Sequence, residues 1–333
     1  MRVLVTSKSF GRVAPDAVEA LRSHGIEVVF GSMPSMSAAA IAAEVAGVDG
    51  LIVGNETVDG GVFAAADRLR LVHMHGTGLD AIDVATATAR RVLVANAPGA
   101  NRNAVAELTV ALMLVAARAI DRHVEILKAG RWERSAGREV SGKTLGILGL
   151  GNIGQRIVEL LSGFGMRVVA CEVRPDEEWV ARHGVELADS VDDVFVQADF
   201  LVLALPLTAG TRGIVDARRL GLMKSSAYLI NTARGGLVDE AALCAALHEG
   251  RIAGAAIDAF DPEPLPADSP LRDLPITLTP HLAATSLEAA AEVSRIVARN
   301  VIDVLVHGRT ECAVNAAAVA RISSLTVKQK DAP

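Results

Sequence analysis

The sequence predicts an α/β protein built from two doubly wound parallel sheets. Short runs of Val, Ile and Leu alternate with Ala-rich stretches of helical length up to about residue 96, and a second, longer series of the same kind begins at Thr144. Apolar strands that alternate with helices are typical of parallel βαβ units. The length of 333 residues agrees with two domains of roughly 150 residues each.

Each strand is expected at a short apolar run. The runs of the first series are Val3–Val5, Ile26–Val29, Gly50–Val53, Leu71–Met74 and Val92–Val94, with helices expected over 14–24, 36–46 and 82–90. The runs of the second series are Thr144–Gly149, Arg167–Glu172, Phe200–Leu205, Tyr228–Asn231, Gly254–Asp258 and Ile276–Thr279.

A long helical stretch joins the two series, from about Asn101 to Gly130. Its broad apolar face includes Val105, Leu108, Leu112, Val115 and Ile120. A helix this apolar must be covered, either by its own chain or by a second copy, and we expect a homodimer through this region. At the other end of the chain, Lys328 to Pro333 are expected to form a frayed polar tail.

Composition excludes several classes of partner. The formal net charge is −6 and aromatic residues make up 3%, which provides neither a basic surface for nucleic acid nor a stacking platform for its bases. Apolar runs such as Val110–Ala117 are shorter than the roughly 18 residues of a membrane helix. The N-terminus lacks the hydrophobic region of a secretion signal, and Cys171, Cys244 and Cys312 are scattered singly. We therefore expect a cytoplasmic protein with reduced thiols and no nucleic-acid or membrane partner.

Residues Gly149-Leu150-Gly151-Asn152-Ile153-Gly154 form a GxGxxG pattern that follows an expected strand and opens an expected helix. The first glycine permits a tight turn, the second clears space for a pyrophosphate, and the third lets the helix pack close to the sheet. The helix N-terminus, which includes Asn152 and Ile153, offers free N–H groups and its positive dipole end to phosphates. This predicts a dinucleotide-binding Rossmann domain.

An acidic residue, Glu172, ends the next expected strand. A carboxylate there accepts hydrogen bonds from the adenosine ribose hydroxyls and repels a 2′-phosphate, so NAD is favoured over NADP. Arg174 lies two residues further on and could soften that preference.

Three polar residues follow strands of the second series, where doubly wound folds place their chemistry: Arg234, Glu263 and His281. Arginine can bind a carboxylate and a carbonyl oxygen together through its planar fork. Histidine exchanges a proton near neutral pH, and a carboxylate beside it fixes its tautomer. Singly, each could be a surface charge, a loop residue or a cap; together with the glycine pattern they predict a catalytic trio.

With these residues in place, the chain resembles the D-isomer-specific 2-hydroxyacid dehydrogenase family, and within it the short forms of phosphoglycerate dehydrogenase. The resemblance spans about residues 1–316. It is carried by Gly76–Asp80, Asn101 with Ala104–Leu108, Gly146–Gly154, Asn231–Gly236 and Pro280-His281.

The resemblance implies a role for each of these sites. Arg234 would orient the substrate, His281 would be the acid and base, and Glu263 would be its partner. Contacts to the cofactor are implied for Thr232, Ala233 and Asp258, the last of these to the nicotinamide carboxamide. Substrate contacts are implied for Asn55, for the backbone N–H groups of Thr77 and Gly78, and for Arg134.

The resemblance also implies a discontinuous substrate domain with a flavodoxin-like fold, residues 1–97 and 287–333, and an inserted NAD-binding domain, residues 98–286.

This chain departs from the pattern of phosphoglycerate dehydrogenases at two positions. Gly54 and Met74 stand where those enzymes commonly have arginines near the phosphate. Losing two charge-assisted contacts, at roughly 1.5–3 kcal/mol each, would weaken a phosphate site severely. Nearby, His73 and His75 should point to the same face, and no third residue is evident that would make them a metal site.

The sequence thus predicts an NAD-dependent D-2-hydroxyacid dehydrogenase that interconverts a small 2-keto acid and its (R)-2-hydroxy acid. An anionic-tailed substrate such as 3-phosphoglycerate or a phosphonate analogue stays open, as does a hydroxypyruvate or glyoxylate reductase. The alternative from another class is an NAD-sensing, corepressor-like binding protein on the same scaffold.

Overall fold

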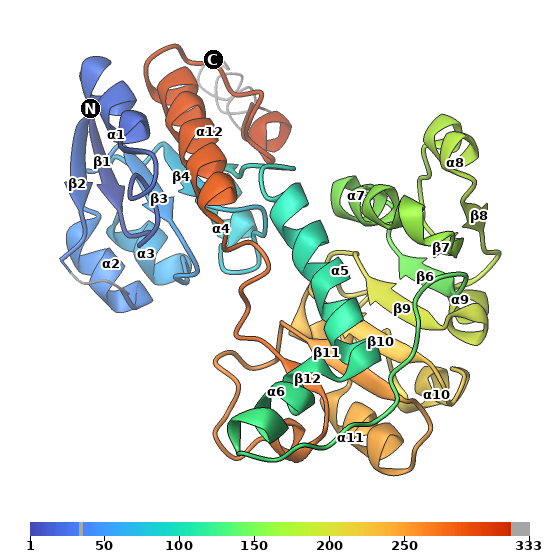
Figure 1. Ribbon diagram of the computed structural model, residues 1–333. Coiled ribbons are helices and arrows are strands. Elements are labelled where there is room, and N and C mark those ends of the chain that lie inside the picture. The colour runs from blue at the N-terminus through green and yellow to red at the C-terminus, as the bar shows by residue number, and fades with distance from the viewer. Residues whose placement is uncertain (33–35, 321–333) are drawn as a thin grey trace. The chain divides into compact units, whose positions relative to one another are not determined.

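Five parallel strands in the order β2-β1-β3-β4-β5 form the sheet of the first unit of the chain (Figure 1). The computed structural model describes residues 1–32 and 36–320, so the predicted tail at 328–333 lies outside the described residues. The first unit comprises Met1–Asn101 and the chain from Thr285 onward. Its strands are β1 (Arg2–Val5), β2 (Glu27–Phe30), β3 (Gly50–Val53), β4 (Leu71–Met74) and β5 (Leu93–Ala95). This strand order is the flavodoxin-like one, as predicted.

Helices cover both faces of this sheet. They are α1 (Pro15–Ser23), α2 (Ala38–Glu44), α3 (Gly60–Ala65), α4 (Val84–Ala89) and α12 (Leu287–Leu305). Val3 and Val5 pack with α1 and α12, whereas Leu4 between them packs with α2 and α3. Successive strand residues point to opposite faces, so a strand covered on both sides is apolar throughout, which is the pattern that the sequence shows.

The second unit, Arg102–Ala284, contains a seven-stranded parallel sheet in the order β12-β11-β10-β9-β6-β7-β8. Its strands are β6 (Thr144–Leu148), β7 (Arg167–Cys171), β8 (Glu186–Leu187), β9 (Phe200–Leu203), β10 (Tyr228–Asn231), β11 (Gly254–Ile257) and β12 (Thr277–Leu278). The order reverses between β6 and β9, which is the switch point of a Rossmann sheet and confirms the predicted fold class.

Helices cover both faces of the second sheet as well. They are α5 (Arg102–Arg118), α6 (Ile120–Lys128), α7 (Asn152–Leu161), α8 (Glu177–His183), α9 (Val191–Gln197), α10 (Ala217–Leu220) and α11 (Glu240–His248), with 3-10 turns η1 (Ser162–Phe164), η2 (Gly235–Leu237) and η3 (Pro270–Asp273). Ile147 packs with α5 and α7, whereas Leu148 packs with α9 and α11 on the other face.

Many of these helices begin at an acidic or hydroxyl side chain that accepts a backbone N–H of the first turn. The capping residues are Ser37, Asp59, Asp83, Asp176, Ser190, Asp216, Asp239 and Ser286. Such caps fix where a helix starts because the first-turn N–H groups have no partner within the helix. Helix α7 is different in this respect, and its N-terminus is part of the candidate site.

The prediction of a single helical stretch over Asn101–Gly130 is wrong in detail. The stretch forms two helices, α5 and α6, bent by 64° at Ala119, whose φ is 47°. The end of α5 is fixed by the carbonyl of Ala117, which accepts the backbone N–H of Arg138 at 2.7 Å. Among the described residues, no single helix is long and apolar enough to cross a membrane. Taken together, the two helices of this bent pair have the length and the apolar composition of a membrane-spanning segment.

Candidate active site

The loop after β6 contains three glycines with different structural roles. Gly149 has a φ of 97°, and a Cβ there would lie 2.6 Å from the carbonyl oxygen of Ala204. A Cβ at Gly154 would lie 2.1 Å from the carbonyl oxygen of Gly149. A Cβ at Gly151, by contrast, would meet no described atom within 4 Å. The first and third glycines are therefore required by the fold, and the second faces open space.

Gly151 is also the N-cap of α7, and no side chain in the described part of the chain caps that helix. The N–H groups of its first turn, which includes Asn152 and Ile153, carry the positive end of the helix dipole. A glycine that leaves room for a group, next to a helix start that offers donors, fits the pyrophosphate of a dinucleotide.

The acidic residue after β7, Glu172, is tied to this loop. Its Oε2 accepts the backbone N–H of Leu150 at 2.8 Å, and its Oε1 accepts that of Arg174 at 3.1 Å. Partial burial works to raise the pKa of Glu172, but the backbone N–H donors outweigh it and hold the pKa below its ordinary value. Glu172 is thus an ionised carboxylate beside the glycine loop. A group that accepts hydrogen bonds from the ribose hydroxyls of a dinucleotide needs this charge and this position.

Arg234 lies in a turn after β10 that the side chain of Asn231 closes. Asn231 is fully buried; its Nδ2 donates to the carbonyl of Arg234 at 2.9 Å, and its Oδ1 accepts the N–H of Ala233 at 3.0 Å. The guanidinium of Arg234 donates from Nη1 to the carbonyl of Ala233 at 2.8 Å. Sequence reasoning noted Asn231 as part of a motif but missed its role in shaping this turn.

The turn of Arg234 packs directly against the loop that follows β11. A Cβ at Gly235 would lie 1.9 Å from the carbonyl carbon of Phe260, so the close approach requires glycine. The backbone N–H of Phe260 in turn donates to Oε1 of Glu263 at 3.0 Å. The structure therefore brings the segments of Arg234 and Glu263 together at the carboxyl ends of neighbouring strands.

The side chains of Glu263 and His281 form a hydrogen-bonded pair. The Nδ1 atom of His281 lies 2.8 Å from Oε2 and 2.9 Å from Oε1 of Glu263. An ionised carboxylate can only accept, so Nδ1 carries the proton and Nε2 is left to exchange a proton with another molecule. This is the relation that a carboxylate and a histidine have in acid–base catalysis.

The segment of His281 is anchored by Asp258, which is fully buried at the end of β11. Its carboxylate accepts the Oγ1–H of Thr279 at 2.6 Å, the N–H of Leu282 at 2.9 Å and the N–H of Ala283 at 3.0 Å. These bonds hold the residues on both sides of His281, whose φ of 50° lies in the left-handed region. The sequence predicted a cofactor contact for Asp258 and missed this anchoring, for which an acidic residue at a strand end was the available signal.

The other predicted site residues lie in three places. Thr232, which precedes Ala233, is buried, and its hydroxyl oxygen forms a hydrogen bond of 2.7 Å with the hydroxyl oxygen of Thr109 on α5. Arg134 is exposed between α6 and β6 and makes no hydrogen bond or ion pair with the rest of the described chain. The substrate contacts expected at Asn55, Thr77 and Gly78 lie in the first unit, where the carbonyl of Thr77 accepts a hydrogen bond from Asn96 at 2.6 Å.

Comparison with known proteins identifies the family. Residues 110–283 match the NAD binding domain of the D-isomer specific 2-hydroxyacid dehydrogenases. The D-3-phosphoglycerate dehydrogenase of Methanocaldococcus jannaschii is 39% identical over 320 residues, which are 95% of this chain and 59% of that protein. The chain belongs to the D-2-hydroxyacid dehydrogenase family. Its second unit therefore contains an NAD(P)-binding domain.

Two further proteins extend the comparison. The glyoxylate reductase of Thermofilum pendens is 39% identical over 259 residues, covering 75% of this chain and 76% of that one. The crystal structure of the TT0316 protein from Thermus thermophilus matches 94% of this chain and all of that chain, with a TM-score of 0.85 and 34% identity. The chain spans somewhat more than half the length of the phosphoglycerate dehydrogenases that it matches.

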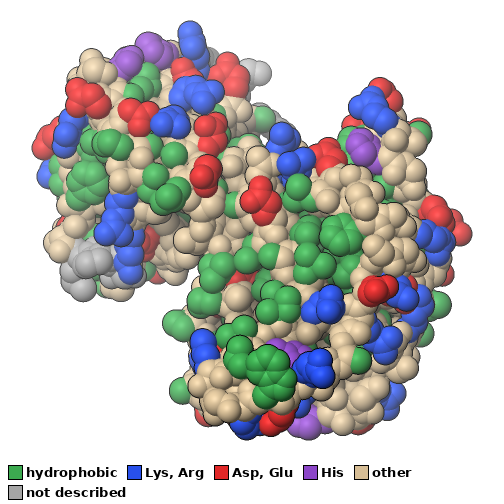
Figure 2. Space-filling view, in the orientation of Figure 1, with side chains coloured by type: hydrophobic (Ala, Val, Ile, Leu, Met, Phe, Trp, Pro, Cys, Tyr) green, Lys and Arg blue, Asp and Glu red, His purple; other side chains and the backbone are tan. Residues whose placement is uncertain are grey.

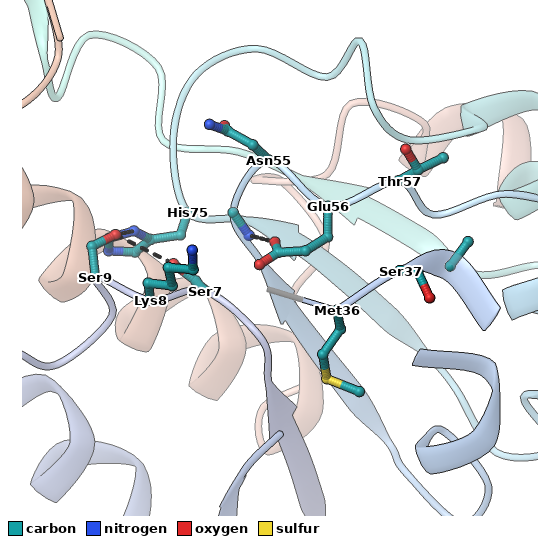
Figure 3. Close-up of a pocket in the computed structure, with 11 residues that line it drawn as sticks. Ser7, Lys8, Ser9, Met36, Ser37, Asn55, Glu56, Thr57 and His75 are labelled. Atoms are coloured by element: carbon teal, nitrogen blue, oxygen red, sulfur yellow. Dashed lines mark hydrogen bonds between the residues drawn. The ribbon is translucent and has the colours of Figure 1, made fainter. Parts of the chain in front are cut away.

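The first unit has a cavity of about 660 Å³ of its own (Figure 3). It is lined by Ser7, Lys8, Ser9, Met36, Ser37, Ala38, Gly54, Asn55, Glu56, Thr57 and His75. The predicted substrate residue Asn55 and the departure at Gly54 are therefore parts of one pocket.

The two histidines of β4 and its end both contact α12, as their expected common face requires. The Nε2 of His73 accepts a hydrogen bond from Asn300 at 3.0 Å, and the Nε2 of His75 lies 2.9 Å from the Oγ of Ser294. Among the described residues, no group of three or more His, Cys, Asp and Glu side chains could hold a metal ion.

Proposed function

We propose that the protein is an NAD-dependent D-2-hydroxyacid dehydrogenase that interconverts a small 2-keto acid and its (R)-2-hydroxy acid. The observation that carries the proposal is the pair of His281 and Glu263, 2.8 Å apart, beside the turn of Arg234. The family, the open space at Gly151 and the carboxylate of Glu172 support a dinucleotide in the same unit.

Each polar residue has a separate task in the proposed reaction. The planar fork of Arg234 binds the substrate carboxylate and polarises the carbonyl, and the N–H groups of Thr77 and Gly78 receive the carboxylate. During reduction, protonated His281 donates a proton from Nε2 to the carbonyl oxygen; during oxidation, neutral His281 removes it from the hydroxyl. When bound, the nicotinamide supplies or accepts the hydride.

Cofactor binding is proposed for the residues around the glycine loop and the ends of β7, β10 and β11. These residues are Gly149, Gly151, Asn152, Ile153, Gly154, Glu172, Thr232, Ala233 and Asp258. The position of the ionised Glu172 favours NAD over NADP, because a 2′-phosphate would meet its negative charge. The ratio of kcat/KM for NADH to that for NADPH tests this preference, and Glu172→Ala should lower the ratio.

The two units divide the work in this proposal. The discontinuous unit, expected from the sequence as residues 1–97 and 287–333, is the substrate domain, and residues 98–286 form the cofactor domain. Arg134 and Asn55 would contact the part of the substrate beyond its carbonyl.

We also propose a homodimer through the region of α5 and α6. On α6, Ile120 is 45% exposed, Val124 42% and Leu127 59%, and Trp132 beyond the helix is 83% exposed. Arg118, His123 and the first three of these line a groove of about 380 Å³. Figure 2 shows hydrophobic side chains gathered on this side of the second unit. A second copy of the same patch would cover it, as a two-fold interface requires.

A panel of 2-keto acids tests the proposed activity. NADH and NADPH oxidation would be followed with hydroxypyruvate, glyoxylate, 3-phosphohydroxypyruvate and phosphonopyruvate. Turnover on at least one of them should fall by roughly 10²–10⁴ in His281→Ala while NADH binding persists. Near-native turnover in that variant would reject the role of His281, and NADH binding without turnover on any keto acid would favour the NAD-sensing binding protein instead.

A further inference from the structure

The cavity of the first unit has a hydrogen-bond network whose direction can be assigned. The hydroxyl of Ser294 donates to the carbonyl of Ala290 at 2.8 Å, so its one proton is used. The bond of 2.9 Å between Ser294 and His75 must then have the Nε2–H of His75 as its donor. Burial lowers the pKa of His75 to about 4, which keeps the ring neutral and leaves Nδ1 as an acceptor.

Two serines complete this network on the pocket side. The Oγ of Ser9 lies 2.9 Å from Nδ1 of His75, so Ser9 donates to the ring. The Oγ of Ser7 lies 3.3 Å from that of Ser9, whose proton is already used, so Ser7 is the donor in that pair. Figure 3 shows these two hydrogen bonds. Since both hydroxyl protons are used in them, the two serine oxygens offer only lone pairs to a bound molecule.

Glu56 adds a negative charge to the same lining. It is 8% exposed, and its Oε2 accepts the backbone N–H of Gly54 at 2.6 Å. A side chain at position 54 would begin in close contact with this carboxylate, since a Cβ at Gly54 would be 3.2 Å from Oε2. Its Oε1 has no hydrogen-bond partner among the described residues and stays an acceptor. The N–H of Gly54, a donor that an anion could have used, is taken by Glu56.

Lys8 is the cation among the described residues that line this cavity. Its side chain is exposed, whereas Glu56 is buried. Water screens an exposed ammonium group far more than a buried carboxylate, so Glu56 contributes more to the potential inside the pocket.

We infer that this cavity selects substrates whose distal group donates hydrogen bonds, such as a hydroxyl, and rejects a phosphate at that position, with Glu56 as the residue that determines this specificity. The inference rests on the proposed function and names the substrate class of that site. A hydroxyl can donate to Glu56, Ser7 or Ser9, whereas a phosphate dianion offers no donor and meets a carboxylate.

A matched pair of substrates tests the inference: hydroxypyruvate and 3-phosphohydroxypyruvate, which differ by the phosphate alone. In steady-state kinetics with NADH, kcat/KM for hydroxypyruvate should exceed that for the phosphorylated acid at least tenfold. Glu56→Gln keeps the acceptor for Gly54 and removes the charge, so the ratio should move at least tenfold toward the phosphorylated acid. Ser9→Ala is the second variant, and it should lower kcat/KM severalfold for hydroxypyruvate alone.

The control is Glu19→Gln, an exposed carboxylate on α1 of the same unit, which should leave the ratio unchanged. A wild-type preference for the phosphorylated acid, or a ratio that Glu56→Gln does not move, would overturn the inference and leave the proposed activity standing. If no keto acid is turned over, the proposed function fails, and calorimetric binding of the two acids to wild type and Glu56→Gln still decides which tail the cavity takes.

Discussion

The Nδ1 atom of His281 lies 2.8 Å from Oε2 of Glu263, and the other oxygen of that carboxylate accepts the backbone N–H of Phe260 at 3.0 Å. The carboxylate is therefore fixed from one side by the main chain and presents lone pairs to the ring from the other. This arrangement selects the tautomer of neutral His281 with its proton on Nδ1. Its Nε2 is then an acceptor in the direction of alcohol oxidation.

Glu263→Gln should reverse this selection. The amide of glutamine can keep the bond from Phe260 through its oxygen, but its NH₂ group then faces Nδ1 as a donor. Neutral His281 would carry its proton on Nε2 and could not accept one from the hydroxy acid. We expect kcat for oxidation to fall by roughly 10²–10⁴, the usual contribution of general acid–base catalysis; a wrong tautomer in a catalytic triad costs about 10⁴.

Steady-state kinetics of 2-hydroxy acid oxidation, with NADH binding as the second readout, measures this effect. The matched control is Glu249→Gln, an exposed residue paired with Arg251, which should leave kcat unchanged. An oxidation rate in Glu263→Gln within a few-fold of wild type would show that Glu263 does not set the tautomer.

The glycine loop allows a second prediction with an internal control. Gly151→Ala places a methyl group in open space, so the fold should tolerate it while the cofactor loses the room that the glycine leaves. Gly154→Ala puts a Cβ 2.1 Å from the carbonyl oxygen of Gly149, so the packing of α7 must shift. We expect Gly151→Ala to weaken NADH binding at least tenfold with little change in the free energy of unfolding, and Gly154→Ala to lower the free energy of unfolding by about 1–3 kcal/mol.

Fluorescence titration with NADH and urea unfolding separate the two effects. If Gly151→Ala were as destabilised as Gly154→Ala, the second glycine would be a packing residue and not a cofactor residue.

The exposed face of α6 leads to a prediction about assembly. Leu127→Arg puts a charge in the patch of Ile120, Val124 and Leu127, where burial by a second copy would leave it unpaired. The wild-type protein should be a dimer by light scattering at micromolar concentration, and Leu127→Arg should be largely monomeric. Val196→Arg, at a 50% exposed position on α9, is the control and should remain a dimer. A monomeric wild type would refute the proposed interface.

The sequence was most informative where a strand is buried on both faces. β3, β4 and β9 consist entirely of buried residues, so their apolar runs are continuous and were located to within about two residues. The break between α5 and α6 was not predictable, because Ala119 carries no glycine or proline signal. A distant segment causes it: the N–H of Arg138 bonds the carbonyl of Ala117, and a Cβ at Gly137 would lie 2.8 Å from that same oxygen.

The candidate site, too, could be predicted from the sequence only in part. The pairing of His281 with Glu263 was expected because both residues follow strands of the second series and because the resemblance to the family implies it. The role of Glu56 was missed, since it depends on a side chain that turns back to the N–H of a residue two positions earlier, at Gly54. The anchoring of the His281 segment by Asp258 was also missed, because it joins residues more than twenty positions apart.

The buried His73 and the half-buried His75 of the first unit predict how its stability depends on pH. Burial is the main cause that lowers the pKa of His73 to about 4, and burial also lowers that of His75 to about 4, from an ordinary value of 6.5. The unfolded chain therefore binds protons in a pH range where the folded unit does not, and stability falls as the pH falls from about 6.5 to about 4. For the fully buried His73, this difference in pKa between the unfolded and the folded chain lowers the free energy of unfolding by about 3 kcal/mol over that pH interval.

Urea unfolding between pH 7.5 and 4 measures this loss. Both tryptophans, Trp132 and Trp179, lie in the second unit, so their fluorescence follows that unit, whereas circular dichroism follows both. We expect the acid-dependent fall in the unfolding midpoint to be seen by circular dichroism and to become shallower in His75→Gln, because one of the two groups that take up a proton on unfolding is gone. His24→Gln, which removes an exposed histidine of the same unit, should keep the wild-type slope. Equal slopes in wild type and His75→Gln would show that His75 is protonated in the folded unit, which would also remove the basis for assigning Nδ1 as the acceptor of the Ser9 proton.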